Sequence, residues 1–284
     1  MSVNKLLVAG AGQMGAGIVQ VSAVAGLDVV MIDVADEFIA RGMAGIQKGL
    51  TRMVDKGKME VAVRDAALAR ITTSTDMAAG KDADLFVEAA PEVMDIKKNL
   101  FGRAAATLRA DAILATNTSS LSVSELARFV TGPQRFVGIH FFNPVPLMAL
   151  VEVVKGAATS DATLAAARSY AEAVGKTPIT VKDSPGFVVN RILFPMINEA
   201  ALAFAEGVAS AEDIDTGMRL GTNWPMGPLA LADLVGLDTT TAVLETFARE
   251  TGDAKYRPAA VLGELVAAGK LGRKSGAGFY DYGK

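Results

Sequence analysis

The amino-acid sequence predicts an α/β fold: a Rossmann-like, doubly wound and mainly parallel sheet, followed by an all-α C-terminal domain. Three observations support this prediction. Short apolar runs alternate with helical patterns up to about residue 180, and only helical patterns follow residue 182. A glycine-rich turn comes directly after the first apolar run. We therefore expect two domains, residues 1–182 and 183–284.

The predicted strands are short runs of apolar and β-branched residues bounded by turn signals. LLVAG at residues 6–10 is the first. Its apolar character is continuous because a parallel strand covered by helices is buried on both faces. Similar runs predict strands at 28–33, 85–90, 112–117, 135–140 and 149–154.

The predicted helices fill the intervals between the strands, as the crossovers of a parallel sheet require. The 36–70 interval is longer than an ordinary crossover and contains several glycines, so we expect a helix–turn–helix excursion there. In the second domain, Ser184-Pro185-Gly186 is the expected helix start. The helical segments are 14–25, 36–70, 92–109, 122–129 and 161–174, followed by 186–206, 211–219, 228–235, 237–250 and 258–268.

The composition excludes several classes of site and partner. The 284 residues include one histidine and no cysteine. This rules out disulfide scaffolds, thiolate or multi-histidine metal sites and a cysteine nucleophile, so we expect no metal. The net charge is -3 without a long run of like charge, so we expect no nucleic-acid partner.

Two apolar stretches resemble export or membrane segments. The run from Lys5 to Ala25 is interrupted by glycines and leads into another strand pattern, so we expect no signal peptide. Residues 186–206 are long enough to span a bilayer, but they include Arg191 and Glu199, which are costly in lipid. We expect a buried core helix there, no membrane partner and a cytoplasmic protein.

The glycine-rich turn has the G-x-G-x-x-G spacing, with Gly10, Gly12 and Gly15. Glycines permit a tight turn and close approach of the backbone to a pyrophosphate, which the helix N-terminus then faces. Asp33 ends the second predicted strand, where an acid can bond a ribose 2′-hydroxyl and would repel a 2′-phosphate. The pattern predicts NAD rather than NADP. The alternative is a tight turn and a helix-capping aspartate without a ligand.

The single histidine, His140, ends a predicted strand and opens the proline-broken loop FFNPVP. Ligands bind at the carboxyl edge of open α/β sheets, and imidazole suits a base that accepts a proton during alcohol oxidation. Glu152 lies on the next predicted strand, where its carboxylate could return beside the imidazole and fix its tautomer. The alternative is a histidine satisfied within the core, and the residues alone leave both open.

Other polar residues join the same edge of the predicted sheet. Asn117, Ser119 and Ser120 follow a strand, and either face a ligand or cap a helix. Asn190 lies in an apolar helical stretch, and serves either a site or an internal hydrogen-bond network. Lys56, in DKGK, belongs either to a solvated turn or to a phosphate contact.

Seven segments appear in the order typical of one family and cover nearly the whole chain: GAGQMGAGI, VEAAPE, NTSSLS, HFFNPVPLMALVEVV, DSPGFVVNRILFPMINEA, GPLALADLVGLD and GRKSGAGFY. On these segments the sequence resembles the L-3-hydroxyacyl-CoA dehydrogenases, particularly the short bacterial 3-hydroxybutyryl-CoA dehydrogenases. The combination of HFFNPVP with SPGFVVNR is highly specific for this family.

The resemblance implies roles for individual residues. It implies that His140 is the catalytic acid/base, with Glu152 as its partner. Ser119 and Asn190 would lie by the reacting part of the substrate, and Lys56 would contact its coenzyme A portion. The implied cofactor contacts are Gly10, Gly12, Gln13, Met14, Gly15, Asp33, Glu92, Lys97, Asn117, Asn143 and Lys274.

We therefore expect an NAD-dependent oxidoreductase that interconverts (S)-3-hydroxybutyryl-CoA and acetoacetyl-CoA. The resemblance implies that residues 1–182 bind NAD, and that residues 183–284 contribute to substrate binding and to a homodimer. Gly49 departs from the family pattern, because some members carry a serine there beside coenzyme A. The alternatives are a related dehydrogenase of a 3-hydroxy acid without coenzyme A, or a non-catalytic NAD-binding protein on the same scaffold.

Overall fold

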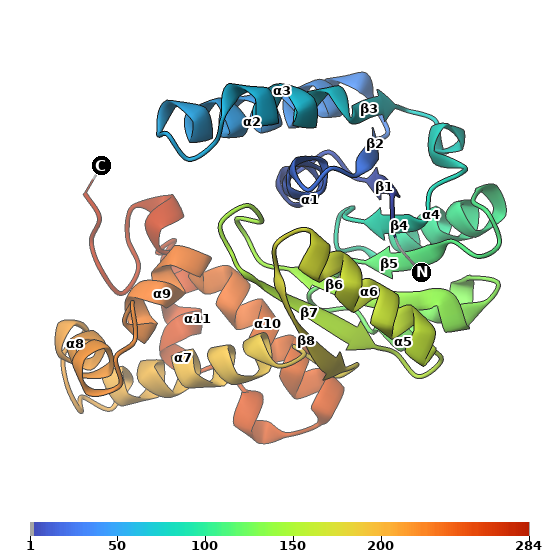
Figure 1. Ribbon diagram of the computed structural model, residues 1–284. Coiled ribbons are helices and arrows are strands. Elements are labelled where there is room, and N and C mark those ends of the chain that lie inside the picture. Colours follow the sequence, from blue (N-terminus) through green and yellow to red (C-terminus); the bar gives the residue numbers. More distant parts are fainter. Residues whose placement is uncertain (1–2, 284) are drawn as a thin grey trace. The chain divides into compact units, whose positions relative to one another are not determined.

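The computed structural model describes residues 3–283 and divides the chain into two compact units (Figure 1). The first unit ends at Phe187 and the second begins at Val188. Separate clusters of buried apolar residues form the cores of the two units.

The first unit is built on one sheet of eight strands. The strands are β1 (Lys5–Ala9), β2 (Asp28–Ile32), β3 (Ile71–Ser74), β4 (Leu85–Glu88), β5 (Ile113–Thr116), β6 (Phe136–Phe141), β7 (Leu150–Lys155) and β8 (Thr177–Lys182). Their order is β3-β2-β1-β4-β5-β6-β7-β8, and only the β6–β7 pair is antiparallel. The strand order reverses beside β1, which is where open α/β sheets bind ligands.

Helices cover both faces of this sheet, which confirms the doubly wound prediction. They are α1 (Gln13–Val24), α2 (Asp36–Asp55), α3 (Val61–Ala69), α4 (Met94–Thr107), α5 (Val123–Leu126) and α6 (Asp161–Ala173). Successive residues of β1 point to opposite faces. Leu6 and Val8 belong to a core with residues of α1, α2 and α6, whereas Leu7 and Ala9 belong to a core with residues of α4 and α5.

The excursion predicted for residues 36–70 is confirmed, because α2 and α3 form a helix–turn–helix there. Two strands lie outside the predicted set, namely β3 and β8. Both are edge strands that pair with a single neighbour, so their sequences ITTS and TPITVK are partly polar and partly exposed. An edge strand also tolerates Pro178, which argues against a central strand. A search of the sequence for continuous apolar runs therefore does not identify β3 and β8.

The second unit is helical, as predicted. Within the described residues its helices are α7 (Val189–Ala205), α8 (Ala211–Gly221), α9 (Pro228–Val235), α10 (Leu237–Thr251) and α11 (Ala260–Ala267). Their apolar faces meet in a core that includes Phe194, Ile197, Leu229, Leu244 and Leu262.

The start of α7 differs from the prediction. The helix was expected from residue 186 but begins at Val189. Gly186 and Phe187 have φ of 74° and 53°, in the left-handed region, and cannot belong to a right-handed helix. Among residues 3–283, no helix is both long and apolar enough to cross a membrane.

Candidate active site

The turn between β1 and α1 has the backbone geometry that the glycine spacing predicts. Gly10 has φ of 110°, and a Cβ there would lie 2.4 Å from the carbonyl oxygen of Ala89. A Cβ at Gly15 would lie 1.8 Å from the carbonyl oxygen of Gly10. At Gly12, by contrast, a Cβ would meet nothing within 4 Å. The open side of Gly12 therefore gives a ligand access to the N-terminus of α1, which favours anions.

Asp33 follows β2 and lies beside this turn. Its Oδ2 accepts a hydrogen bond from the Ala11 amide at 2.7 Å, and its Oδ1 accepts one from the Val34 amide at 2.7 Å. These bonds hold the carboxylate in the wall of a cavity of about 1120 Å³. The same cavity is lined by the predicted cofactor residues Gly10, Gly12, Gln13 and Met14.

Helices α2 and α4 supply walls of this cavity that no sequence motif indicates. The Arg41 guanidinium lies 4.7 Å from the centroid of the Phe38 ring, and Asn99 and Arg103 line the cavity from α4. Exposed polar residues on a helix carry no spacing signal, so only the folded chain brings them here. Glycine backbone, a carboxylate and guanidinium groups in one cavity suit the phosphates and riboses of a dinucleotide, so the residues present fit NAD.

His140 and Glu152 form a buried pair at the carboxyl end of β6. The antiparallel register places the two residues opposite each other on β6 and β7. The Nδ1 atom of His140 lies 2.8 Å from Oε2 of Glu152, whose side chain is fully buried. The rings of Phe142 and Phe187 pack beside the imidazole, with their centroids 4.6 and 5.6 Å from the imidazole centroid. The carboxylate thus holds one ring nitrogen and leaves Nε2 as the nitrogen that can exchange a proton with a ligand.

The loop that joins β6 to β7, residues 142–149, carries Asn143 close in sequence to His140. Asn117 fixes its beginning, because Oδ1 of Asn117 accepts a hydrogen bond from the Phe141 amide at 2.9 Å. The residue that follows β5 is thereby tied to the end of β6. Asn143 is exposed on the loop.

Lys176 anchors the middle of the same loop, and no sequence motif indicates it. Its ammonium donates to the carbonyls of Val145 at 2.6 Å and Met148 at 2.8 Å. Burial lowers the pKa of Lys176 below its ordinary value. The Val145 side chain packs on Gly17 of α1, where a Cβ would lie only 2.7 Å from Val145 Cβ. The cofactor helix and the loop after His140 are thus in direct contact.

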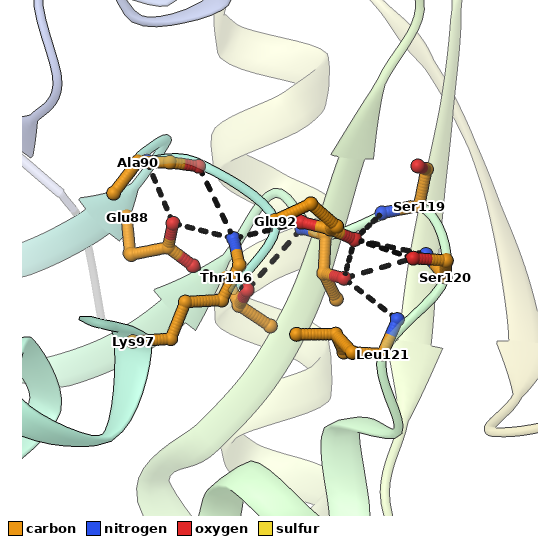
Figure 2. Close-up of polar contacts among 9 residues, drawn as sticks. Glu88, Ala90, Glu92, Lys97, Thr116, Ser119, Ser120 and Leu121 are labelled. Atoms are coloured by element: carbon orange, nitrogen blue, oxygen red, sulfur yellow. Dashed lines mark hydrogen bonds and ion pairs between the residues drawn. The ribbon is translucent and has the colours of Figure 1, made fainter. Parts of the chain in front are cut away.

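Glu92 and Lys97 belong to a polar network between β4, β5 and α4 (Figure 2). The Lys97 ammonium lies 2.6 Å from Glu88 Oε1 and 3.0 Å from Glu92 Oε2, and its side chain is 1% exposed. It also donates to the Ala90 carbonyl at 3.4 Å. The Lys97 ammonium therefore has three protein acceptors, and its predicted cofactor contact stays a prediction.

The second oxygen of Glu92 organises the loop that carries Ser119. Oε1 accepts hydrogen bonds from the Thr118 hydroxyl, from the amides of Ser119 and Ser120, both at 3.1 Å, and from the Ser120 hydroxyl at 2.9 Å (Figure 2). Burial raises the pKa of Glu92, but the Lys97 charge and the hydrogen bonds from Thr118, Lys97 and Ser120 outweigh it. The resulting pKa is below the ordinary value. Ser119 itself is exposed.

Three further predicted site residues lie at the end of α2 or in the second unit. Lys56 is exposed at the end of α2. Asn190 is the second residue of α7, and Lys274 donates to Asp238 at 2.7 Å, both in the second unit. Their roles stay predictions. Within residues 3–283, no cluster of acidic and histidine side chains is arranged to hold a metal ion.

Two family models together match nearly the whole chain. The 3-hydroxyacyl-CoA dehydrogenase NAD binding domain matches residues 5–184, and the 3-hydroxyacyl-CoA dehydrogenase C-terminal domain matches residues 186–282. The boundary between the two matches falls within three residues of the boundary between the structural units.

Individual proteins resemble the chain over its full length. A probable 3-hydroxybutyryl-CoA dehydrogenase of Deinococcus radiodurans is 50% identical over 278 residues, which are 98% of this chain and 100% of the relative. The 3-hydroxybutyryl-CoA dehydrogenase of Clostridioides difficile is 47% identical over 280 residues, which are 99% of this chain and 100% of the relative. The crystal structure of (S)-3-hydroxybutyryl-CoA dehydrogenase PaaH1 from Ralstonia eutropha matches with a TM-score of 0.98 at 50% identity, covering 100% of both chains.

Proposed function

The chain belongs to the 3-hydroxyacyl-CoA dehydrogenase family, and we propose that it interconverts (S)-3-hydroxybutyryl-CoA and acetoacetyl-CoA with NAD. The buried His140–Glu152 pair, at the carboxyl edge of a sheet with a dinucleotide cavity, is the observation that carries the proposal. It supplies the proton acceptor that alcohol oxidation needs.

The two residues divide the acid–base work between them. In the oxidation direction, Nε2 of His140 accepts the proton of the 3-hydroxyl group, and in reduction it returns that proton. The Glu152 carboxylate holds Nδ1 at 2.8 Å, which fixes the tautomer and stabilises the imidazolium that forms. NAD, when bound, supplies the nicotinamide that accepts or returns the C3 hydride. Since no other histidine exists in the chain, no neighbouring imidazole can replace His140.

The turn at Gly10–Gly15 and the Asp33 carboxylate would hold the cofactor, with its pyrophosphate at the N-terminus of α1. The Asp33 carboxylate favours NAD over NADP because it would repel a 2′-phosphate. Asn117 and Asn143 would contact the cofactor from the loops after β5 and β6. We also propose a cofactor role for Glu92, for Lys97 and for Lys274 of the second unit.

On the substrate side, we propose that Ser119 and Asn190 bond the reacting oxygen or the thioester carbonyl. Lys56 would contact the coenzyme A portion. Gly49 has no side chain to add there, and a Cβ at this position would lie 2.9 Å from Gln20 Oε1. The contacts to coenzyme A along α2 would therefore come from other residues.

The two alternative functions are not favoured. Relatives at 46–50% identity over almost the entire chain are named as dehydrogenases or probable dehydrogenases of 3-hydroxybutyryl-CoA. A non-catalytic protein would have no need of a buried histidine–carboxylate pair at the end of β6.

We propose that residues 1–182 bind NAD, and that residues 183–284 contribute to substrate binding and form a homodimer in the cytoplasm. Several large apolar side chains of the second unit are exposed, and a symmetric dimer could cover them. They are Ile192, Val208, Leu220 and Leu234.

The test is a pair of measurements on the parent protein and on His140→Gln. In an NADH absorbance assay with acetoacetyl-CoA, the parent should turn over, and the variant should lose about 10²–10⁴-fold in kcat because it lacks the acid/base. NADH binding, followed by fluorescence, should be retained in the variant. Near-normal turnover of His140→Gln would contradict the mechanism. Turnover of free acetoacetate but not of acetoacetyl-CoA would contradict the substrate assignment.

A further inference from the structure

Glu88, the last residue of β4, is a fully buried carboxylate to which the reaction above assigns no role. We propose that Glu88 is a positioning residue that sets the conformation of the loop carrying Ser119, residues 117–121. This inference rests on the proposed function, because it assigns Glu88 to the reaction at that site. Two hydrogen-bonded routes connect Glu88 to the loop.

The first route passes through two charged side chains. Glu88 Oε1 lies 2.6 Å from the Lys97 ammonium, which in turn lies 3.0 Å from Glu92 Oε2. The other Glu92 oxygen accepts the amides of Ser119 and Ser120, as Figure 2 shows. The orientation of the Glu92 carboxylate, and with it the backbone of Ser119, thus depends on where Lys97 is held.

The second route passes through neutral groups on the neighbouring strand. The Thr116 hydroxyl donates to Glu88 Oε2 at 2.7 Å and accepts a hydrogen bond from the Thr118 amide at 3.2 Å. The Thr118 hydroxyl donates to Glu92 and accepts from the Leu121 amide at 2.9 Å. Both routes therefore meet where the Thr118 hydroxyl donates to Glu92, whose Oε1 also accepts the Ser119 amide.

Glu88 also bonds the wall of the cofactor cavity. Its Oε1 accepts a hydrogen bond from the Ala90 amide at 2.7 Å, and Ala90 lines the cavity. One buried carboxylate thus joins the cofactor side and the Ser119 side of the same sheet edge. A buried ion pair adds little stability over apolar side chains of similar volume, whereas its directional bonds fix a geometry. This arrangement therefore fits a positioning role better than a purely stabilising one.

A double-mutant cycle tests the proposal, because coupling to Ser119 is a readout that a merely structural residue would not produce. The variants are Glu88→Gln, Ser119→Ala and the double variant, compared by kcat/KM for acetoacetyl-CoA with NADH. Glutamine keeps the shape of the side chain but removes its charge. We expect each single variant to lose about tenfold or more, and the double variant to lose little beyond Ser119→Ala alone. NADH affinity should change by less than about threefold, because the amide oxygen of the introduced glutamine can still accept from the Ala90 amide.

Glu125→Gln is the matched control, since Glu125 is exposed on α5 close to the same loop and should keep the parent kinetics. If Glu88→Gln does not fold, Thr116→Val interrupts the second route alone and enters the same cycle with Ser119→Ala. The positioning role would be overturned if Glu88→Gln lowered kcat/KM by the same factor in the parent protein and in Ser119→Ala. A parent-like kcat/KM in Glu88→Gln would overturn it as well. A parent protein that does not turn over acetoacetyl-CoA would instead overturn the proposed function, and this inference with it.

Discussion

Gly17 of α1 offers a direct test of how the cofactor helix positions the loop after His140. A Cβ at Gly17 would lie 2.7 Å from Val145 Cβ and 3.0 Å from Val145 Cγ2. Carbon atoms in ordinary contact are about 3.5–4.0 Å apart. Gly17→Ala therefore requires that α1 and the 142–149 loop separate by about 1 Å.

The loop has little freedom to absorb this displacement elsewhere. The Val145 side chain is buried, and its carbonyl is held by Lys176 at 2.6 Å. Since a misplacement of about 1 Å can cost about 10²-fold in rate, we expect kcat/KM to fall by about 10–100-fold. Overpacking costs about 1–3 kcal/mol, which exceeds the roughly 1 kcal/mol that alanine gains over glycine within a helix. The free energy of unfolding should therefore fall, and Tm with it by a few degrees.

Steady-state kinetics with acetoacetyl-CoA and NADH, together with thermal unfolding, measure both effects. Gly102→Ala is the matched control, because Gly102 lies within α4 and a Cβ there would meet nothing within 4 Å. That variant should keep the parent kinetics and gain about 0.5–1 kcal/mol in the free energy of unfolding. A Gly17→Ala protein with parent kinetics and a Tm raised as in Gly102→Ala would refute the steric reasoning.

Two further predictions concern buried and half-buried charges. Lys176→Met should lower Tm and reduce kcat/KM by about tenfold, because the buried Val145 carbonyl loses its donor at a cost of about 1–3 kcal/mol and the loop relaxes. Lys182→Met is the control, because Lys182 is exposed at the end of β8, and it should change neither Tm nor kcat/KM. If Lys176→Met behaves like the parent protein, Lys176 does not anchor the loop. The pKa of Glu92 lies below its ordinary value of 4.5 in the folded protein, so the unfolded chain binds the proton more readily. The free energy of unfolding should then fall as the pH drops from 4.5 toward the folded pKa. Denaturant titrations at several pH values should show a weaker fall in Glu92→Gln than in the parent protein. The same dependence of the unfolding free energy on pH in both proteins would contradict this.

Much of the fold and part of the site are encoded in local patterns. Continuous apolar runs identify the central strands, because helices cover both faces of a parallel sheet and burial there is complete. The glycine spacing identifies the turn at Gly10, since only a residue without a Cβ tolerates its φ of 110° and the approach of Ala89. A histidine at one strand end and an acid on the next strand made a His140–Glu152 pair one of two open interpretations, and the antiparallel register brings His140 Nδ1 to 2.8 Å from Glu152 Oε2.

Features that depend on contacts between distant segments have no such local signal. The edge strands β3 and β8 are half polar, and Phe187 adopts a φ of 53° that delays the start of α7 by three residues. A lysine or glutamate looks the same in the sequence whether it is solvated or buried.

The sequence by itself therefore determined the doubly wound class and the glycine-rich turn, because each follows from residues that are neighbours in the chain. It placed His140 and Glu152 on consecutive strands, but only the antiparallel register of β6 and β7 decided that the two side chains meet. Only the tertiary structure decided that Glu88, Lys97 and Lys176 are buried and which groups they bond. The reason is physical: the order of strands in the sheet brings segments that are distant in sequence together, and a buried charge is stable only where those segments supply its partners.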